Sequence, residues 1–136
     1  MTVAKSIEPC YRPPLLGCRD LCPVLGVSAE PLLADIDLTD VNCCDVLDNP
    51  WRDVRRKTLD WVIIGCESKG RKVGRLPGGT EAGYWQAAKS LIDQCRAAGV
   101  RVFHKQGAID GMVSHSPAEW PEWARVQEWP KGKVTT

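Results

Sequence analysis

Residues 59–68 read LDWVIIGCES, and this stretch decides the fold class that the sequence predicts. A run of strand-forming apolar residues stops abruptly at Gly65 and is followed by a carboxylate, Glu67. Two further stretches have the same form, PVLGVSAEP at 23–31 and VRVFHKQG at 100–107. Apolar runs without alternation are typical of strands that are covered on both faces. The three runs therefore predict buried, mostly parallel strands of an α/β sheet.

One long helix is predicted between the second and third of these strands. Apolar residues recur there at spacings of three and four, so they form one stripe along residues 81–98. The members of the stripe are Trp85, Ala88, Leu91, Ile92 and Cys95. Thr80 is a suitable N-cap, and Gly99 is a suitable C-terminal stop. A strand, a helix and a strand of these lengths predict a right-handed βαβ unit with parallel strands.

Polar side chains follow each predicted strand, and they are the candidate functional residues. In parallel α/β sheets the ligand lies beyond the carboxyl ends of the strands, where these side chains converge. We expect Glu30, Glu67 and Lys105 to meet there as acid/base or substrate-orienting catalytic residues. The residues predicted to bind a cofactor or substrate beside them are Ser28, Gly65, Ser68 and Gln106. Alternatively, Glu30 or Glu67 forms a structural ion pair with Lys105 or accepts backbone N–H bonds from the following turn.

Residues 67–79, ESKGRKVGRLPGG, are predicted to form a loop between the second strand and the helix. Glycines allow close approach of the backbone, and the cations could meet phosphate or carboxylate, with Arg71 and Arg75 as the candidate ligand-binding residues. Neither of the glycine-rich phosphate-binding motifs is present. A solvent-exposed loop is the alternative interpretation. His104 precedes Lys105, so strand alternation predicts that it packs on the opposite side of the sheet.

Size, charge and cysteine content bound the class of protein. The chain has 136 residues and a formal net charge of +1, which predicts one domain and no global attraction to nucleic acid. No apolar stretch approaches the ~18 residues of a membrane span, so we expect a cytoplasmic protein. Seven cysteines, an odd number, do not indicate a disulfide framework. No metal site is predicted, because Cys10, Cys18 and Cys22 lack a C-x-x-C spacing, and Cys43 and Cys44 receive no role.

The chain divides into an irregular lead-in at residues 1–22 and a single α/β domain at 23–136. The domain ends in a tail rich in tryptophan, and Trp120, Trp123 and Trp129 are expected to pack back over the sheet. The alternative is an exposed aromatic platform for bases, which no basic groove accompanies. Ser116 and Glu119 have the spacing of a capping box, which predicts a short helix at this point.

Several of these stretches together resemble a family of uncharacterised phage proteins, also found in bacteria, that is related to the radical S-adenosylmethionine enzymes. The matching elements are Ser28 to Leu33, Trp61 to Ser68 and the Lys105–Gln106 pair. The resemblance spans roughly residues 18 to 130 and fits the C-terminal half of the family. Members usually carry Gly-Gly-Glu-Ser where this chain has Gly65-Cys66-Glu67-Ser68, and often Lys-Gln-Trp-Gly where it has Lys105-Gln106-Gly107.

The resemblance implies a half TIM-type barrel of three to four mostly parallel strands with one long amphipathic helix. It also implies S-adenosylmethionine and an iron–sulfur cluster as cofactors, but only if an N-terminal half or a second polypeptide supplies the cysteine triad. We therefore expect no cofactor for this chain alone, a small-molecule ligand at the strand ends, no membrane partner and a bacterial host cytoplasm as the location. The alternative function is a non-catalytic binding or assembly module, or a degenerate phage remnant.

Overall fold

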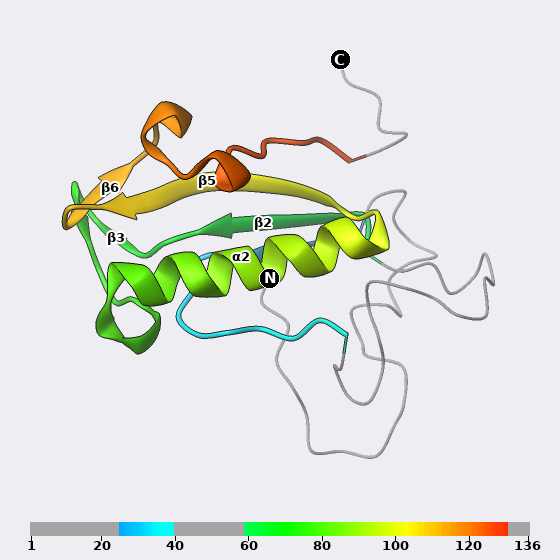
Figure 1. Ribbon diagram of the computed structural model, residues 1–136, viewed down its shortest axis with the longest axis horizontal. Helices are drawn as coiled ribbons and strands as arrows, with labels where there is room; N and C mark the ends of the chain where they lie inside the picture. The colour runs from blue at the N-terminus through cyan, green and yellow to red at the C-terminus, as the bar shows by residue number, and fades with distance from the viewer. Residues whose placement is uncertain (1–24, 40–58, 131–136) are drawn as a thin grey trace.

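The computed structural model describes residues 25–39 and 59–130 of the chain. The predicted lead-in at 1–22 lies outside these residues, as do Cys10, Cys18, Cys22, Cys43 and Cys44. The described residues form one six-stranded sheet in the order β1-β2-β5-β6-β4-β3, with the long helix α2 packed along it (Figure 1). No helix among these residues is long and apolar enough to cross a membrane.

One half of the sheet is parallel and matches the predicted βαβ unit. Its strands are β1 (Gly26–Ala29), β2 (Trp61–Gly65) and β5 (Arg101–Ile109). β2 lies between the other two and is parallel to both. The third strand is longer than the predicted Val100 to His104 and is interrupted by a register shift opposite Gly65, which pairs with Gln106.

The other half of the sheet is antiparallel, and it shows that the predicted fold class is wrong. β3 (Ser68–Lys69), β4 (Lys72–Val73) and β6 (Met112–Ser114) join the sheet beyond β5, each antiparallel to its neighbours. Two strand pairings are therefore parallel and three are antiparallel. The sheet is mixed, with a single long helix among the described residues, and is not a mostly parallel half of a TIM-type barrel.

Tight turns are the physical reason for this difference. The chain reverses at Gly70, which has a φ of 67°, so β3 and β4 form a hairpin instead of the predicted loop. It reverses again at Asp110 and Gly111, whose φ angles are 50° and 77°. Glu81 holds this second turn, because its carboxylate accepts hydrogen bonds from the backbone N–H groups of both turn residues. Two-residue turns return a strand antiparallel to the one before it, whereas a parallel return needs a long crossover.

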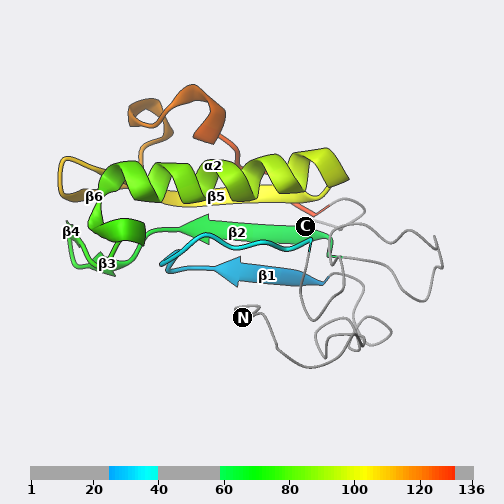
Figure 2. The same cartoon turned by 60° about the horizontal axis from the view of Figure 1, so that its bottom comes forward.

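The helix α2 (Glu81–Ala98) has the predicted bounds. The Thr80 side chain accepts a hydrogen bond from Gly83 N, and Gly99 adopts the left-handed conformation at the C-terminal end. The buried residues of the helix are Tyr84, Ala87, Ala88, Leu91, Ile92 and Cys95. They belong to the same core cluster as Val62, Ile64 and Val102 of the parallel strands, which are fully buried. Figure 2 shows α2 lying along these strands.

The C-terminal segment runs back along β5. Residues 117–119 form a 3-10 turn without the predicted capping box, because the Glu119 carboxylate accepts a hydrogen bond from the Ser114 hydroxyl. Trp120 is buried and Trp123 is half-buried, as expected for a covering tail, whereas Trp129 is 67% exposed. Glu128 fixes the last part of this segment beside β5, since its N–H donates to Val102 O and its carboxylate accepts from Val102 N.

Candidate functional site: a pocket on the open face of the parallel strands

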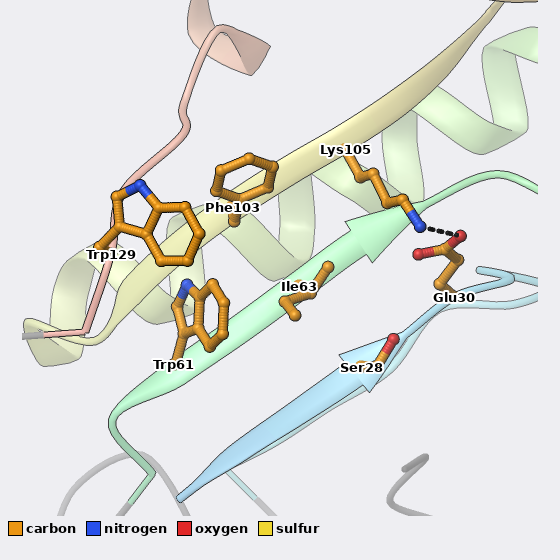
Figure 3. A pocket seen from close by; sticks show the side chains of 7 residues that line it. All are labelled: Ser28, Glu30, Trp61, Ile63, Phe103, Lys105 and Trp129. Carbon is orange, nitrogen blue, oxygen red and sulfur yellow. Dashed lines mark hydrogen bonds and ion pairs between the residues drawn. The ribbon is translucent and has the colours of Figure 1, made fainter. Parts of the chain in front are cut away.

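A pocket of about 310 Å³ lies on the face of the parallel strands that α2 does not cover (Figure 3). Strand alternation places its lining side chains on this face and the buried core residues on the other. The lining residues are Ser28, Glu30, Trp61, Ile63, Phe103, Lys105 and Trp129. They come from all three parallel strands and from the C-terminal segment. Side chains that are far apart in the sequence therefore line one continuous surface.

The charged end of the pocket is an ion pair between Glu30, which follows β1, and Lys105, which lies in the middle of β5. Lys105 Nζ is 3.3 Å from Glu30 Oε1, so these two predicted catalytic residues meet as expected. The Lys105 side chain is 53% exposed and that of Glu30 is 23% exposed, which leaves both groups accessible to a ligand. Ser28 lines the same pocket two residues before Glu30. The same geometry also matches the alternative of a structural ion pair.

Gly65 allows the Glu30 carboxyl group to lie close to the end of β2. A Cβ atom on this glycine would lie 3.2 Å from Glu30 Cγ, 3.3 Å from its carboxyl carbon and 3.4 Å from Gln106 Cγ. Contacts of 3.2 Å are tighter than ordinary van der Waals contacts between carbon atoms, so any larger residue would push the carboxyl group away. Gly65 therefore does not line the pocket itself, but it leaves the space that Glu30 needs to reach it.

Gln106, predicted to support the ligand, has its amide group engaged in the protein. The side-chain Nε2 donates to Cys66 O at 2.6 Å, and Gln106 as a whole is only 5% exposed. The backbone carbonyl oxygen of Gln106 accepts a hydrogen bond from the Tyr84 hydroxyl at 2.9 Å. These bonds tie the ends of β2 and β5 to α2, so Gln106 stabilises the rim on which the ion pair stands.

Glu67 does not line the pocket, although it lies only two residues after the end of β2. Its carboxylate accepts hydrogen bonds from Arg75 at the backbone N and at two guanidinium nitrogens. Arg75 thereby lowers the pKa of the Glu67 carboxyl group from 4.5 to about 2. Gly74 makes room for this contact, because a Cβ atom there would lie 2.6 Å from Glu67 Oε2. The contact between Glu67 and Arg75 holds the segment between β4 and α2 against the residue that precedes β3. The Arg75 side chain is 70% exposed.

Ser68 and Arg71, the remaining predicted ligand-binding residues, lie on the β3–β4 hairpin and outside the pocket lining. The Ser68 hydroxyl donates to Gly70 O at 2.7 Å and stabilises the turn. The side chain of Arg71 is exposed, and its carbonyl oxygen accepts a hydrogen bond from Val113 N. The structure thus brings together Ser28, Glu30, Lys105 and the neighbouring Gly65, and it separates from them the residues of the 67–75 segment.

The aromatic end of the pocket was not predicted from the sequence. The Trp61 and Trp129 rings are 5.4 Å apart, and the Phe103 ring lies 5.6 Å from Trp129 and 6.4 Å from Trp61. Trp61 Nε1 donates to Glu128 O at 2.8 Å, which fixes both the indole and the segment that carries Trp129. The signal in the sequence was the alternation of Trp61 with Ile63 and of Phe103 with Lys105. These pairs place aromatic and polar side chains on the same face of their strands.

On the opposite face, His104 is fully buried against α2, as alternation predicted. Its Nε2 lies 2.7 Å from the Tyr84 hydroxyl, and its ring packs 4.3 Å from that of Trp120. Its Nδ1 atom has no hydrogen-bond partner among the described residues. Burial lowers the pKa of His104 from 6.5 to about 4. This histidine is a neutral core residue that does not reach the pocket.

The described part of the chain contains no group of three His, Cys, Asp or Glu side chains that could hold a metal ion. Its two cysteines, Cys66 and Cys95, are buried free thiols. Burial raises the pKa of Cys66 to about 11 and that of Cys95 to about 12. Both thiols are therefore protonated at neutral pH, whereas metal ligation requires the thiolate.

These observations define a small mixed α/β domain with a ligand-sized pocket that is aromatic at one end and charged at the other. A model of a protein family described as "Protein of unknown function (DUF5131)" matches residues 21–127, and the chain belongs to this family. Neither the curated proteins nor the solved structures gave a match. The family description names no activity, so the likeness to radical S-adenosylmethionine enzymes remains a prediction.

Proposed function

We propose that this domain binds an elongated small molecule with a flat ring at one end and a zwitterionic group at the other. The observation that carries the proposal is the arrangement of the pocket, in which an aromatic trio and an ion pair occupy opposite ends of one surface. A flat ring would stack on the exposed Trp129 and on Trp61, since aromatic pairs add about 0.5–1.5 kcal/mol beyond simple burial.

The ion pair favours a ligand head with both charges. A ligand with a single charge would bind one member of the pair and leave the other without its partner. A zwitterion can place its ammonium group on Glu30 and its carboxylate on Lys105, so the one hydrogen bond between these side chains is replaced by two charge-assisted bonds to the ligand. The Ser28 hydroxyl lies on the same lining and could add a hydrogen bond to the head group.

The register of the sheet sets the length of such a ligand. Trp61 is the partner of Arg101, and Lys105 lies four residues further along the same strand. At 3.3 Å per residue, the level of Trp61 is separated from Lys105 by about 13 Å, whereas Phe103 is only two positions from Lys105. A free amino acid held at the ion pair is too short to reach Trp61 as well. S-adenosylmethionine, the ligand that the family resemblance suggests, has an adenine ring and an amino-acid head at opposite ends of an extended chain.

The proposal assigns binding and orientation of the ligand to this chain, and it assigns the redox step to a partner. An iron–sulfur cluster supplies the electron for radical cleavage of S-adenosylmethionine in enzymes that perform it. The described residues offer no thiolate set for such a cluster. Cys10, Cys18 and Cys22 lie outside the described residues and lack a C-x-x-C spacing. We propose that an N-terminal half or a second polypeptide with a cysteine triad supplies the cluster, in a bacterial host cytoplasm.

Calorimetric titration with S-adenosylhomocysteine, the stable analogue of the cofactor, tests the proposal. We expect it to bind more tightly than adenosine or methionine alone, because only the complete molecule reaches both ends of the pocket. The Trp129→Ala variant should weaken binding of S-adenosylhomocysteine and adenosine but not of methionine. No measurable binding of any of the three compounds would refute this choice of ligand.

Anaerobic reconstitution with iron and sulfide tests the proposed division of labour. We expect a protein that stays colourless and still binds S-adenosylhomocysteine. An absorption band near about 400 nm together with cleavage of S-adenosylmethionine would place the cluster in this chain and contradict the assignment to a partner.

A further inference from the structure

We infer that the β3–β4 hairpin is a second, separate binding site that contacts the phosphate backbone of a nucleic acid. The inference starts from the register of the hairpin. Lys69 of β3 is directly opposite Lys72 of β4, so their Cβ atoms are separated by roughly 5 Å on the same face of the sheet. Arg71 occupies the turn between them and is also exposed. Three cations thus lie within four consecutive positions at one edge of the sheet.

This arrangement is unfavourable for the protein alone. Like charges directly opposite each other destabilise a strand pair, and an acceptor of opposite charge would normally accompany them. None of the salt bridges formed among the described residues includes Lys69, Arg71 or Lys72. The cations therefore keep their charge available for an external anion.

The nearby acidic groups are occupied elsewhere or exposed. Glu67 is bound by Arg75, and Lys69 acts on it only as a neighbouring charge. Glu81 accepts the N–H groups of the Asp110–Gly111 turn. Asp110 itself is exposed at that turn. No acidic side chain of the described residues neutralises the lysine pair by direct contact.

The hairpin is fixed in place, so its charges are presented in a defined arrangement. Lys72 pairs with Met112 of β6, Val73 N donates to Gly111 O, and Val113 N donates to Arg71 O. Gly70 adopts a positive φ with no atom within 4 Å of the site of a Cβ, which leaves the outer side of the turn open. A ligand can approach the turn without displacing protein.

A polymer with several phosphates fits this surface better than a single small anion or a membrane. The three cations lie on a projecting edge and line no pocket, so one phosphate would gain little from any exposed lysine. Several phosphates bound together release several counterions, and this release drives the binding of nucleic acids. A membrane surface is less suitable, because Met112, 43% exposed, is the only large apolar side chain paired with this edge of the described sheet.

Fluorescence anisotropy with a labelled single-stranded DNA of about 20 nucleotides at about 25 mM salt tests the inference. The double variant Lys69→Glu/Lys72→Glu should bind at least about tenfold more weakly than the wild type. The matched control is Lys89→Glu/Arg96→Glu, which changes the net charge equally on the exposed side of α2 and should bind within about twofold of the wild type. Circular dichroism melting curves establish that both variants are folded.

The salt dependence gives an independent reading. For three phosphate contacts, the slope of log K against log salt should be close to about −2, and it should approach zero in the hairpin variant. Equal losses in the two double variants, or no binding of the DNA by the wild type, would overturn the inference. Competition by micromolar pyrophosphate, or binding to anionic phosphatidylserine vesicles without binding to DNA, would overturn it as well. Because these readouts do not involve S-adenosylhomocysteine, they can fail or succeed independently of the pocket.

Discussion

Lys105 Nζ lies 3.3 Å from Glu30 Oε1, and this contact joins the end of β1 to β5 across 75 positions of sequence. Because both side chains are partly exposed, the pair adds about 0.2–1 kcal/mol at most to the free energy of unfolding. The proposed role of the pair in ligand binding can therefore be tested by substitutions that change stability little.

The first prediction concerns this lysine. Lys105→Met should reduce the affinity for S-adenosylhomocysteine by about tenfold, because the ligand carboxylate loses a charge-assisted hydrogen bond. The free energy of unfolding in urea should change by less than about 1 kcal/mol. Lys89→Met, which removes an exposed lysine paired with Asp93 on α2, is the control and should leave the affinity unchanged. Equal affinities of wild type and Lys105→Met would show that the ammonium group does not touch the ligand.

The second prediction concerns the glycine beneath the Glu30 carboxyl group. Gly65→Ala should weaken ligand binding, because the added methyl group would lie 3.2 Å from Glu30 Cγ and displace the carboxylate. In a Glu30→Ala background the same substitution should have little further effect, since the displaced group is already gone. Calorimetry of the two single variants and the double variant measures this coupling. Additive losses would mean that Gly65 acts on the ligand by another route.

The third prediction separates Glu67 from the pocket. Glu67→Gln should leave the affinity for S-adenosylhomocysteine within about twofold of the wild type, because the carboxylate is engaged by Arg75 and does not line the pocket. A larger loss would support the acid/base or substrate-orienting role that the sequence predicts for Glu67. Gly74→Ala is a useful companion variant, because it should disturb the Glu67 carboxylate while leaving the pocket intact.

The fourth prediction concerns pH. The pKa of His104 is about 4 in the folded protein, against 6.5 for a histidine exposed to solvent in the unfolded chain. Below pH 6.5 the unfolded chain therefore binds a proton that the folded protein does not. Stability should therefore fall as the pH decreases from 6.5 toward 4, by about 2 kcal/mol at pH 5. Urea unfolding of His104→Gln should lack this loss between about pH 7 and pH 5. If the free energy of unfolding depends on pH in the same way in both proteins, a group other than His104 is responsible.

The elements with strong local signals were predictable from the sequence. α2 was predicted with its observed bounds because the apolar stripe, Thr80 and Gly99 all indicate the same helix. The parallel pairing of β2 with β5 followed from the length of the connection. The meeting of Glu30 and Lys105 followed in turn, since Glu30 follows β1, Lys105 lies where β5 ends its parallel pairing with β2, and both strands flank β2.

The antiparallel half of the sheet was missed because its signals are not local. β3 and β4 have two residues each, too few to show alternation, and they are stabilised by pairing with β6 some forty residues later in the chain. The aromatic end of the pocket was missed for a similar reason. Trp129 reaches Trp61 and Phe103 only because Glu128 binds the backbone of Val102 and accepts the Trp61 indole N–H, and no sequence pattern indicates these contacts.

The most direct test of the proposed pocket is a titration of ¹⁵N-labelled protein with S-adenosylhomocysteine, followed through the tryptophan indole N–H signals by NMR. Trp61 and Trp129 lie on the open face with the pocket, whereas Trp85 and Trp120 contact His104 on the face of α2. We predict saturable shifts of the Trp61 and Trp129 indole signals and none of the other two. Unchanged indole signals at saturation, or shifts confined to Trp85 and Trp120, would contradict the account.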